Sequence, residues 1–135
     1  MEPKVTLLIR QLHGGTGPAS IWRNDKSRTE SLMCRFTNEG KMTVTFGEWP
    51  REQGGNWKVS DPRLVVLPER GASNSVRPIR LLPGHTYDTQ ITLSFPKARS
   101  GEKIPYEVTF VASPLKGQKE KPLMLKSKPL TLFVD

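Results

Sequence analysis

An alternating run that follows a tight turn constrains this fold more than any other feature of the chain. One set of alternate positions, with polar residues between them, holds Tyr87, Thr89, Ile91, Leu93 and Phe95. This period of two is typical of a strand that buries one face. The Pro83-Gly84 pair before it predicts a tight turn, because proline fixes φ and glycine accepts a positive φ. A turn that leads into a strand headed by tyrosine is typical of two-sheet sandwiches, so the sequence predicts an all-β protein.

Turn residues separate further strand-like runs about every ten positions along the rest of the chain. These runs cover residues 5–10, 32–36, 42–46, 64–67, 76–81, 104–112, 123–125 and 130–134. The Asn38-Glu39-Gly40 turn predicts a hairpin between the runs on either side of it, and the last two runs predict a closing hairpin. We expect one domain over residues 1–135, folded as an antiparallel two-sheet sandwich of about seven to nine strands.

The side chains that catalysis or metal binding would need are scarce. The two histidines, His13 and His85, lie in glycine-containing turn sequences, and the single cysteine, Cys34, lies in the middle of a run at an expected core position. None of them has the ligand spacing of a zinc or copper site. The glycines at 14, 15 and 17 lack the Gly-Lys-Ser/Thr ending of a phosphate-binding loop. We therefore predict a protein that is not an enzyme and has no metal and no cofactor.

The positive charge of the chain is its main sign of a ligand. The formal net charge is +8, and residues 97–128 hold eight basic and three acidic side chains. This surplus favours anionic partners, although lysine also protects edge strands from unwanted pairing. Basic side chains beside tryptophans are typical of single-strand nucleic-acid binders, whereas tryptophans can equally plug the end of a sandwich. The candidate residues for a nucleic acid or an acidic polysaccharide are Trp49, Trp57, Lys116, Lys119 and Lys121.

Two resemblances extend the expectation of a sandwich. The turn from Leu81 to Tyr87 is similar to the corner of fibronectin type III domains, in which a leucine and a Pro-Gly pair precede a strand-opening tyrosine. Four segments together resemble the first domain of periplasmic pilus-assembly chaperones, namely Phe36–Gly40, Trp57–Pro62, Arg80–Gly84 and Tyr106–Val108. These resemblances imply an immunoglobulin-like fold and an interaction role. A pilus chaperone has two domains, and this chain has room for one.

We expect a non-enzymatic, immunoglobulin-like module that binds another protein in a surface, secretion or assembly system. The expected mechanism is strand addition, in which unpaired N–H and C=O groups of an edge strand pair with an extended partner. The candidate edges are the terminal runs at 5–10 and 130–134. The candidate partner-binding residues are Leu130, Leu132 and Val134.

The start of the chain bears on its location. Met1-Glu2-Pro3 opens it without a charged and apolar export leader, which fits either a cytosolic protein or a mature exported sequence with an added methionine. The chaperone resemblance implies a periplasmic or extracellular location. No apolar run approaches the ~20 residues of a membrane span, so we expect no span.

Overall fold

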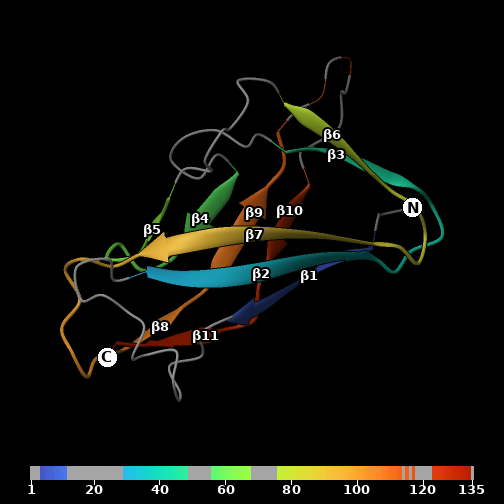
Figure 1. The fold of residues 1–135 in the computed structure, drawn as a ribbon. Coiled ribbons are helices and arrows are strands. Elements are labelled where there is room, and N and C mark those ends of the chain that lie inside the picture. The colour runs from blue at the N-terminus through green and yellow to red at the C-terminus, as the bar shows by residue number, and fades with distance from the viewer. Residues whose placement is uncertain are drawn as a thin grey trace.

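The computed structural model describes residues 4–11, 29–48, 56–67, 76–113, 115, 117 and 123–134. These residues form eleven strands and no helix, which confirms the all-β prediction (Figure 1). The strands are β1 (Val5–Gln11), β2 (Thr29–Asn38), β3 (Val44–Glu48), β4 (Trp57–Val59), β5 (Val65–Val66), β6 (Arg77–Leu81), β7 (Thr86–Ser94), β8 (Lys103–Tyr106), β9 (Val108–Val111), β10 (Met124–Lys126) and β11 (Leu130–Phe133). All ladders between them are antiparallel.

Within the described ranges, the structure contains no helix that is long and apolar enough to cross a membrane.

The largest sheet has four strands in the order β1-β2-β7-β5. Its central strand β2 buries every second side chain, including Leu32, Cys34 and Phe36, because alternate side chains of a strand point to opposite faces. Tyr87 lies opposite Phe36 at the start of β7, the long strand that the sequence predicted. The core position predicted for Cys34 is confirmed.

The C-terminal strands form one broken hairpin. β9 pairs with β10 and β8 pairs with β11, so the chain runs out along β8 and β9 and returns along β10 and β11. The predicted closing hairpin between 123–125 and 130–134 is therefore wrong, because both runs lie on the returning arm. The break falls beside Ser127, whose hydroxyl oxygen accepts a hydrogen bond from the Val108 N–H at 2.9 Å. Such breaks divide long runs, so the described residues form eleven strands in four small sheets rather than seven to nine in two.

The hairpin predicted between 32–36 and 42–46 is also wrong. β3 pairs with β6 instead of β2. The buried Asn38 explains the difference, because its side-chain amide donates hydrogen bonds to the carbonyl oxygens of Met42 at 2.8 Å and Leu81 at 2.9 Å. These bonds tie the end of β2 to the segment before β3 and to the end of β6. The chain after Asn38 thus leaves the first sheet instead of folding back along it.

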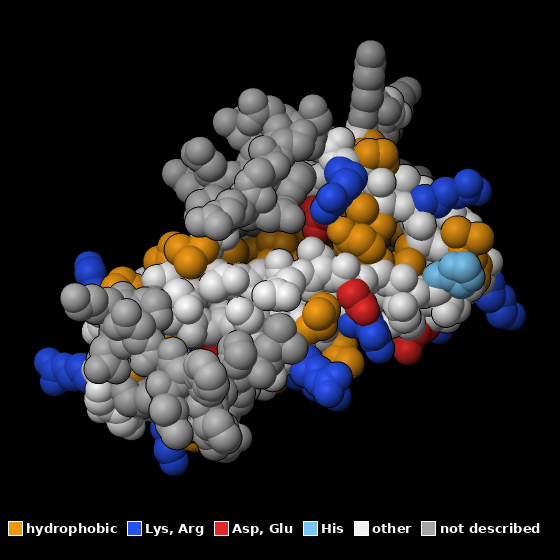
Figure 2. Space-filling model, in the orientation of Figure 1, with side chains coloured by type: hydrophobic (Ala, Val, Ile, Leu, Met, Phe, Trp, Pro, Cys, Tyr) orange, Lys and Arg blue, Asp and Glu red, His pale blue; other side chains and the backbone are white. Residues whose placement is uncertain are grey.

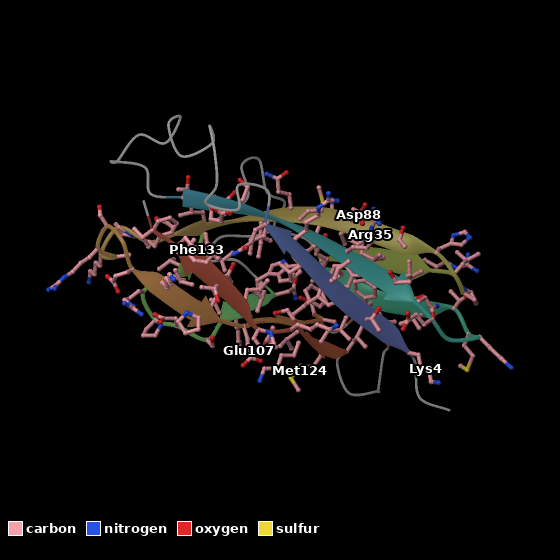
Figure 3. The ribbon with its side chains drawn as sticks, turned by 90° about the horizontal axis from the view of Figure 1, so that it is seen from below. Lys4, Arg35, Asp88, Glu107, Met124 and Phe133 are labelled. Atoms are coloured by element: carbon pink, nitrogen blue, oxygen red, sulfur yellow. The ribbon has the colours of Figure 1, made fainter. Side chains whose placement is uncertain are left out.

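The sheets pack around a shared core with Phe36 at its centre. The centroid of the Phe36 ring lies 5.3 Å from that of Phe46, 5.9 Å from that of Trp57 and 4.9 Å from that of Phe110. These rings come from β2, β3, β4 and β9, so one aromatic cluster joins the four-stranded sheet to the strands across the core. Figures 1 and 3 show the same arrangement from two sides, with β1, β2 and β7 on one side of the core and β4, β8 and β11 on the other.

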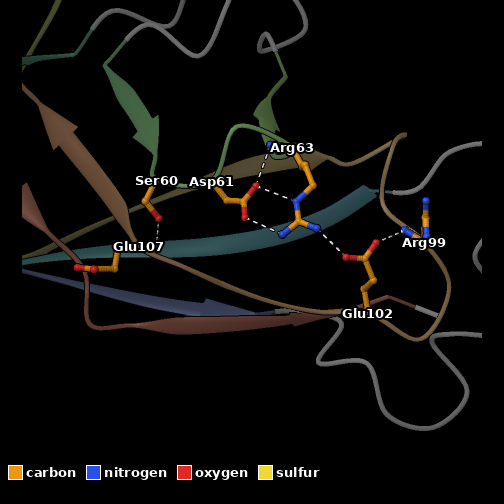
Figure 4. A network of polar contacts seen from close by, with 6 residues as sticks. All are labelled: Ser60, Asp61, Arg63, Arg99, Glu102 and Glu107. Carbon is orange, nitrogen blue, oxygen red and sulfur yellow. Dashed lines mark hydrogen bonds and ion pairs between the residues drawn. The ribbon is translucent and has the colours of Figure 1, made fainter.

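A polar network fixes the turn that leads into β8 (Figure 4). Arg63, in the loop after β4, donates to the carboxylate of Asp61 at 2.9 Å and to that of Glu102 at 2.6 Å. Glu102 also accepts a hydrogen bond from the Arg99 N–H at 2.6 Å. These donors lower the pKa of the Glu102 carboxyl below its usual range, the Arg99 N–H most of all. The Glu102 carboxylate, next to the start of β8, is therefore already paired with Arg63.

Candidate interaction edges

The three predicted partner-binding side chains lie on β11 and its end. Leu132 is 1% exposed and Val134 is also buried, while Leu130 packs against the core from its rim. Their side chains thus hold the C-terminal strand onto the core. A partner that adds to this strand would meet its backbone edge and the side chains that alternate with these three.

The hydrogen bonds of β11 show which backbone groups face outward. The Val134 N–H donates to the Glu102 carbonyl at 2.9 Å, so residue 134 faces the β8 side of the strand. Backbone groups alternate in direction along an antiparallel strand, so those of Leu130 and Leu132 face β8 as well. The N–H and C=O groups of Thr131 and Phe133 must then point away from β8. Within the described structure, these groups form the outer edge of β11.

Gln11, at the end of β1, occupies one of these outward groups. Its side-chain amide donates to the carbonyl oxygen of Thr131 at 2.8 Å and to the hydroxyl of Tyr106 at 3.1 Å. Cα atoms of β1 and β10 also come within 8 Å of each other. A strand that enters between two others needs about twice the ~4.8 Å spacing of paired strands. The gap between β1 and β10 is therefore too narrow to admit a partner strand. Within the described residues, the Thr131 N–H and both backbone groups of Phe133 have no hydrogen-bond partner.

Proline blunts the outer edges of two other strands. The Gly47 carbonyl accepts a hydrogen bond from the Ser113 N–H, so the backbone groups of Gly47 point away from β6. Pro78 is paired opposite Gly47, and its backbone groups therefore point away from β3, towards the outer edge of β6. Pro105, opposite Thr131, faces outward on β8 by the same alternation. Proline has no N–H to offer, which is a common protection of exposed edges. β11 has no proline at its outward positions, Thr131 and Phe133.

Exposed apolar side chains accompany the β10–β11 arm (Figure 3). Phe133 is 43% exposed and Met124 is 69% exposed. The ammonium of Lys103, on β8, lies over the Phe133 ring at 5.6 Å from its centroid. Glu107, between β8 and β9, forms an ion pair with Lys126 at 3.2 Å. The sequence could have indicated Phe133, because it alternates with the core positions 132 and 134.

The residues proposed for an anionic ligand divide into two groups. Trp57 lies in β4 with 8% of its surface exposed, and its ring packs against Phe110 at 4.9 Å between centroids. Little of this ring is accessible to a base or a sugar. Figure 2 shows the Lys and Arg side chains of the described residues spread apart on the face that it draws. The other candidates, Trp49, Lys116, Lys119 and Lys121, lie outside the described residues.

The remaining reactive groups show no assembled site in the described part of the chain. No group of three or more His, Cys, Asp or Glu side chains there could hold a metal ion. Burial, and next to it the charge of Glu48, raises the pKa of the Cys34 thiol to about 12, so the thiolate is scarce at neutral pH. His85 is exposed in the Pro-Gly turn, and His13 lies outside the described residues.

Sequence reasoning missed a buried polar cluster at the end of β3. Glu48 is buried, and its carboxylate accepts hydrogen bonds from Arg77, directly opposite on β6, and from the Tyr87 hydroxyl at 2.8 Å. Burial first, and then the bond to Glu48, raise the pKa of Tyr87 to about 12. The cluster links β3 and β6 to β7. Its acid and its aromatic ring are 39 positions apart, so no local pattern could have indicated it.

Comparisons with known proteins assign no family to this chain. No family model matches the sequence, and no curated protein does. Among solved structures, a Bordetella pertussis protein described as ApaA aligns with 98% of this chain and 94% of its own, at 14% identity and a TM-score of 0.47.

Proposed function

We propose that this chain is a non-enzymatic, immunoglobulin-like sandwich domain that binds another protein by strand addition at the outer edge of β11. The order β1-β2-β7 on one side of the core, and β10-β9-β4 on the other, supports such a sandwich. The resemblance of the turn before Tyr87 to the fibronectin corner supports it as well. In keeping with the chaperone resemblance, we place the domain outside the cytoplasm, in a surface, secretion or assembly system.

The observation that carries this proposal is that the Thr131 N–H and the backbone groups of Phe133 point outward and have no partner among the described residues. Main-chain groups at a sheet edge give a partner strand its affinity, and the side chains between them give selectivity. The edges of β6, in another sheet, and of β8, the partner of β11, carry Pro78 and Pro105 at outward positions, whereas β11 carries none. An edge without proline at its outward positions is one to which a partner strand can add.

The test compares two substitutions at Thr131. Thr131→Pro removes an outward N–H that no described residue uses, whereas Thr131→Val keeps this N–H and changes only the side chain. Leu132→Pro would be less informative, because the N–H of Leu132 faces β8 and its loss would weaken the pairing of β11 with β8. Peptides are first selected by display against the immobilised wild-type domain, and their affinities are then measured for both variants.

We expect Thr131→Pro to lower the affinity for the selected peptides at least about tenfold, because this variant loses a backbone hydrogen bond and the fit around it. Thr131→Val keeps this hydrogen bond, so its affinity should stay within about twofold of the wild-type value. Both variants should unfold cooperatively near the wild-type temperature, because the substituted N–H faces outward. Equal affinity of the two variants would exclude β11 as the binding edge. A display selection that yields no peptide would count against strand addition altogether.

A further inference from the structure

Lys103 lies beside Phe133, one of the residues of the edge proposed above. It lies on β8 directly opposite Phe133, and its ammonium sits over the Phe133 ring at 5.6 Å from the centroid. A strand added to β11 would run about 4.8 Å beyond it. The ammonium would then be within reach of a side chain that such a strand presents on the same face as Phe133.

Among the described residues, two lysines near this edge have no acidic partner. Glu102 and Glu107, which are next in sequence to the two ends of β8, already have partners, since Glu102 binds Arg63 and Glu107 binds Lys126. Lys103 and the exposed Lys128 form no ion pair with any residue in the described ranges. A cation beside a half-exposed aromatic ring and unpaired backbone groups matches a segment with a carboxylate among apolar residues.

We propose that the segment captured by β11 carries an Asp or Glu side chain on the face that it shares with Phe133, and that Lys103 binds this carboxylate. The inference rests on the proposed strand addition and adds to it the chemistry of the partner. Backbone pairing with Thr131 and Phe133 sets the register of the captured segment, and the Phe133 ring packs against an apolar side chain of that segment. Lys103 then distinguishes acidic from neutral or basic segments, as charged groups at a rim commonly do.

Two eight-residue probes of alternating sequence test this inference. One alternates valine with glutamate, the other alternates valine with glutamine, and both are acetylated and amidated so that no terminal charge contributes. Binding is followed through the backbone amide signals of Thr131 and Phe133 in NMR spectra of the labelled domain at low salt. Lys103→Gln is the test variant, and Lys58→Gln, an exposed lysine on β4, is the matched control.

We expect both probes to shift the two amide signals and the glutamate probe to bind about fivefold more tightly, as a rim ion pair allows. Lys103→Gln should reduce this preference to less than about twofold, whereas Lys58→Gln should keep it. Equal binding of the two probes to the wild type, or a preference that survives Lys103→Gln, would overturn the carboxylate inference and leave strand addition intact. If neither probe shifts Thr131 or Phe133, strand addition at this edge fails and the inference fails with it.

Discussion

Single residues in this molecule owe their chemistry to the sheet positions that hold them. Cys34 shares the buried face of β2 with Leu32 and Phe36, and its pKa of about 12 keeps the thiol protonated. Glu48 is buried as well, yet two donors on neighbouring strands compensate its charge. The first position follows from alternation in the sequence. The second needs the register of β3 on β6 and the packing of β7 against them.

The Tyr87–Glu48 hydrogen bond gives a prediction at this scale. Tyr87→Phe removes the hydroxyl that donates to Glu48 at 2.8 Å and leaves the buried carboxylate with Arg77 as its remaining donor from this cluster. The free energy of unfolding should fall by about 1–2 kcal/mol, the usual effect of losing a hydrogen bond to a charged group. Urea unfolding at pH 7 measures it. Asp88→Asn, in the exposed pair with Arg35, should change stability by less than about 1 kcal/mol.

The same substitution has a pH signature. The pKa of Tyr87 is about 12 in the folded chain, above the ordinary value of 10.0, so the unfolded chain loses this proton first as the pH rises. The stability that neutral Tyr87 contributes is therefore complete below pH 10 and is lost between about pH 10 and 12. The phenylalanine variant has no such group. The gap in stability between the two proteins should narrow above pH 10, and a gap that widens there would show that the assignment of the shift is wrong.

At the scale of elements, the sequence predicted where strands lie better than how they pair. Alternation located β2 and β7, because a strand with one buried face has an apolar side chain at every second position, and short apolar runs located β1 and β6. Pairing depends on distant groups. Asn38 binds the carbonyl oxygen of Leu81, 43 positions away, and so diverts the chain that a local turn signal would have folded into a hairpin. The sequence could predict which terminal runs lie at sheet edges, but not which of their backbone groups point outward. The direction of each N–H depends on the strand register and not on residue type.

Pro78 provides a prediction about the edge of β6. Pro78→Thr restores an outward N–H on a strand that is half of a two-stranded sheet in the described structure. The fold should remain, because the substituted N–H faces away from β3, but the bare edge should pair with other copies. Light scattering of the concentrated variant should reveal more association than the wild type shows. Pro78→Ala with an added Arg80→Pro substitution, which removes the next outward N–H, is the matched control and should associate no more than the wild type does.

At the scale of the whole molecule, the excess of basic over acidic side chains is the main electrostatic feature. The formal net charge is +8, the basic side chains lie apart on the face drawn in Figure 2, and Trp57 is packed in the core. A field of this kind attracts any polyanion through counterion release, without distinguishing one from another. A built nucleic-acid or polysaccharide site would add exposed aromatic platforms or directed hydrogen bonds to it. Among the described residues, Trp57 offers no exposed platform of this kind, so our proposal places recognition beyond charge at the β11 edge.

Chromatography on three resins tests this last point. The chain should bind sulfopropyl, heparin and single-stranded DNA resins of equal charge density at about 50 mM salt, and leave all three at nearly the same concentration, below about 300 mM, because screening and counterion competition alone release it. Lys103→Gln should shift the three elution points equally and slightly. Retention on heparin or DNA well beyond the sulfopropyl resin would mean that the polymer makes contacts other than charge, and the anionic ligand would then replace the peptide as the better candidate.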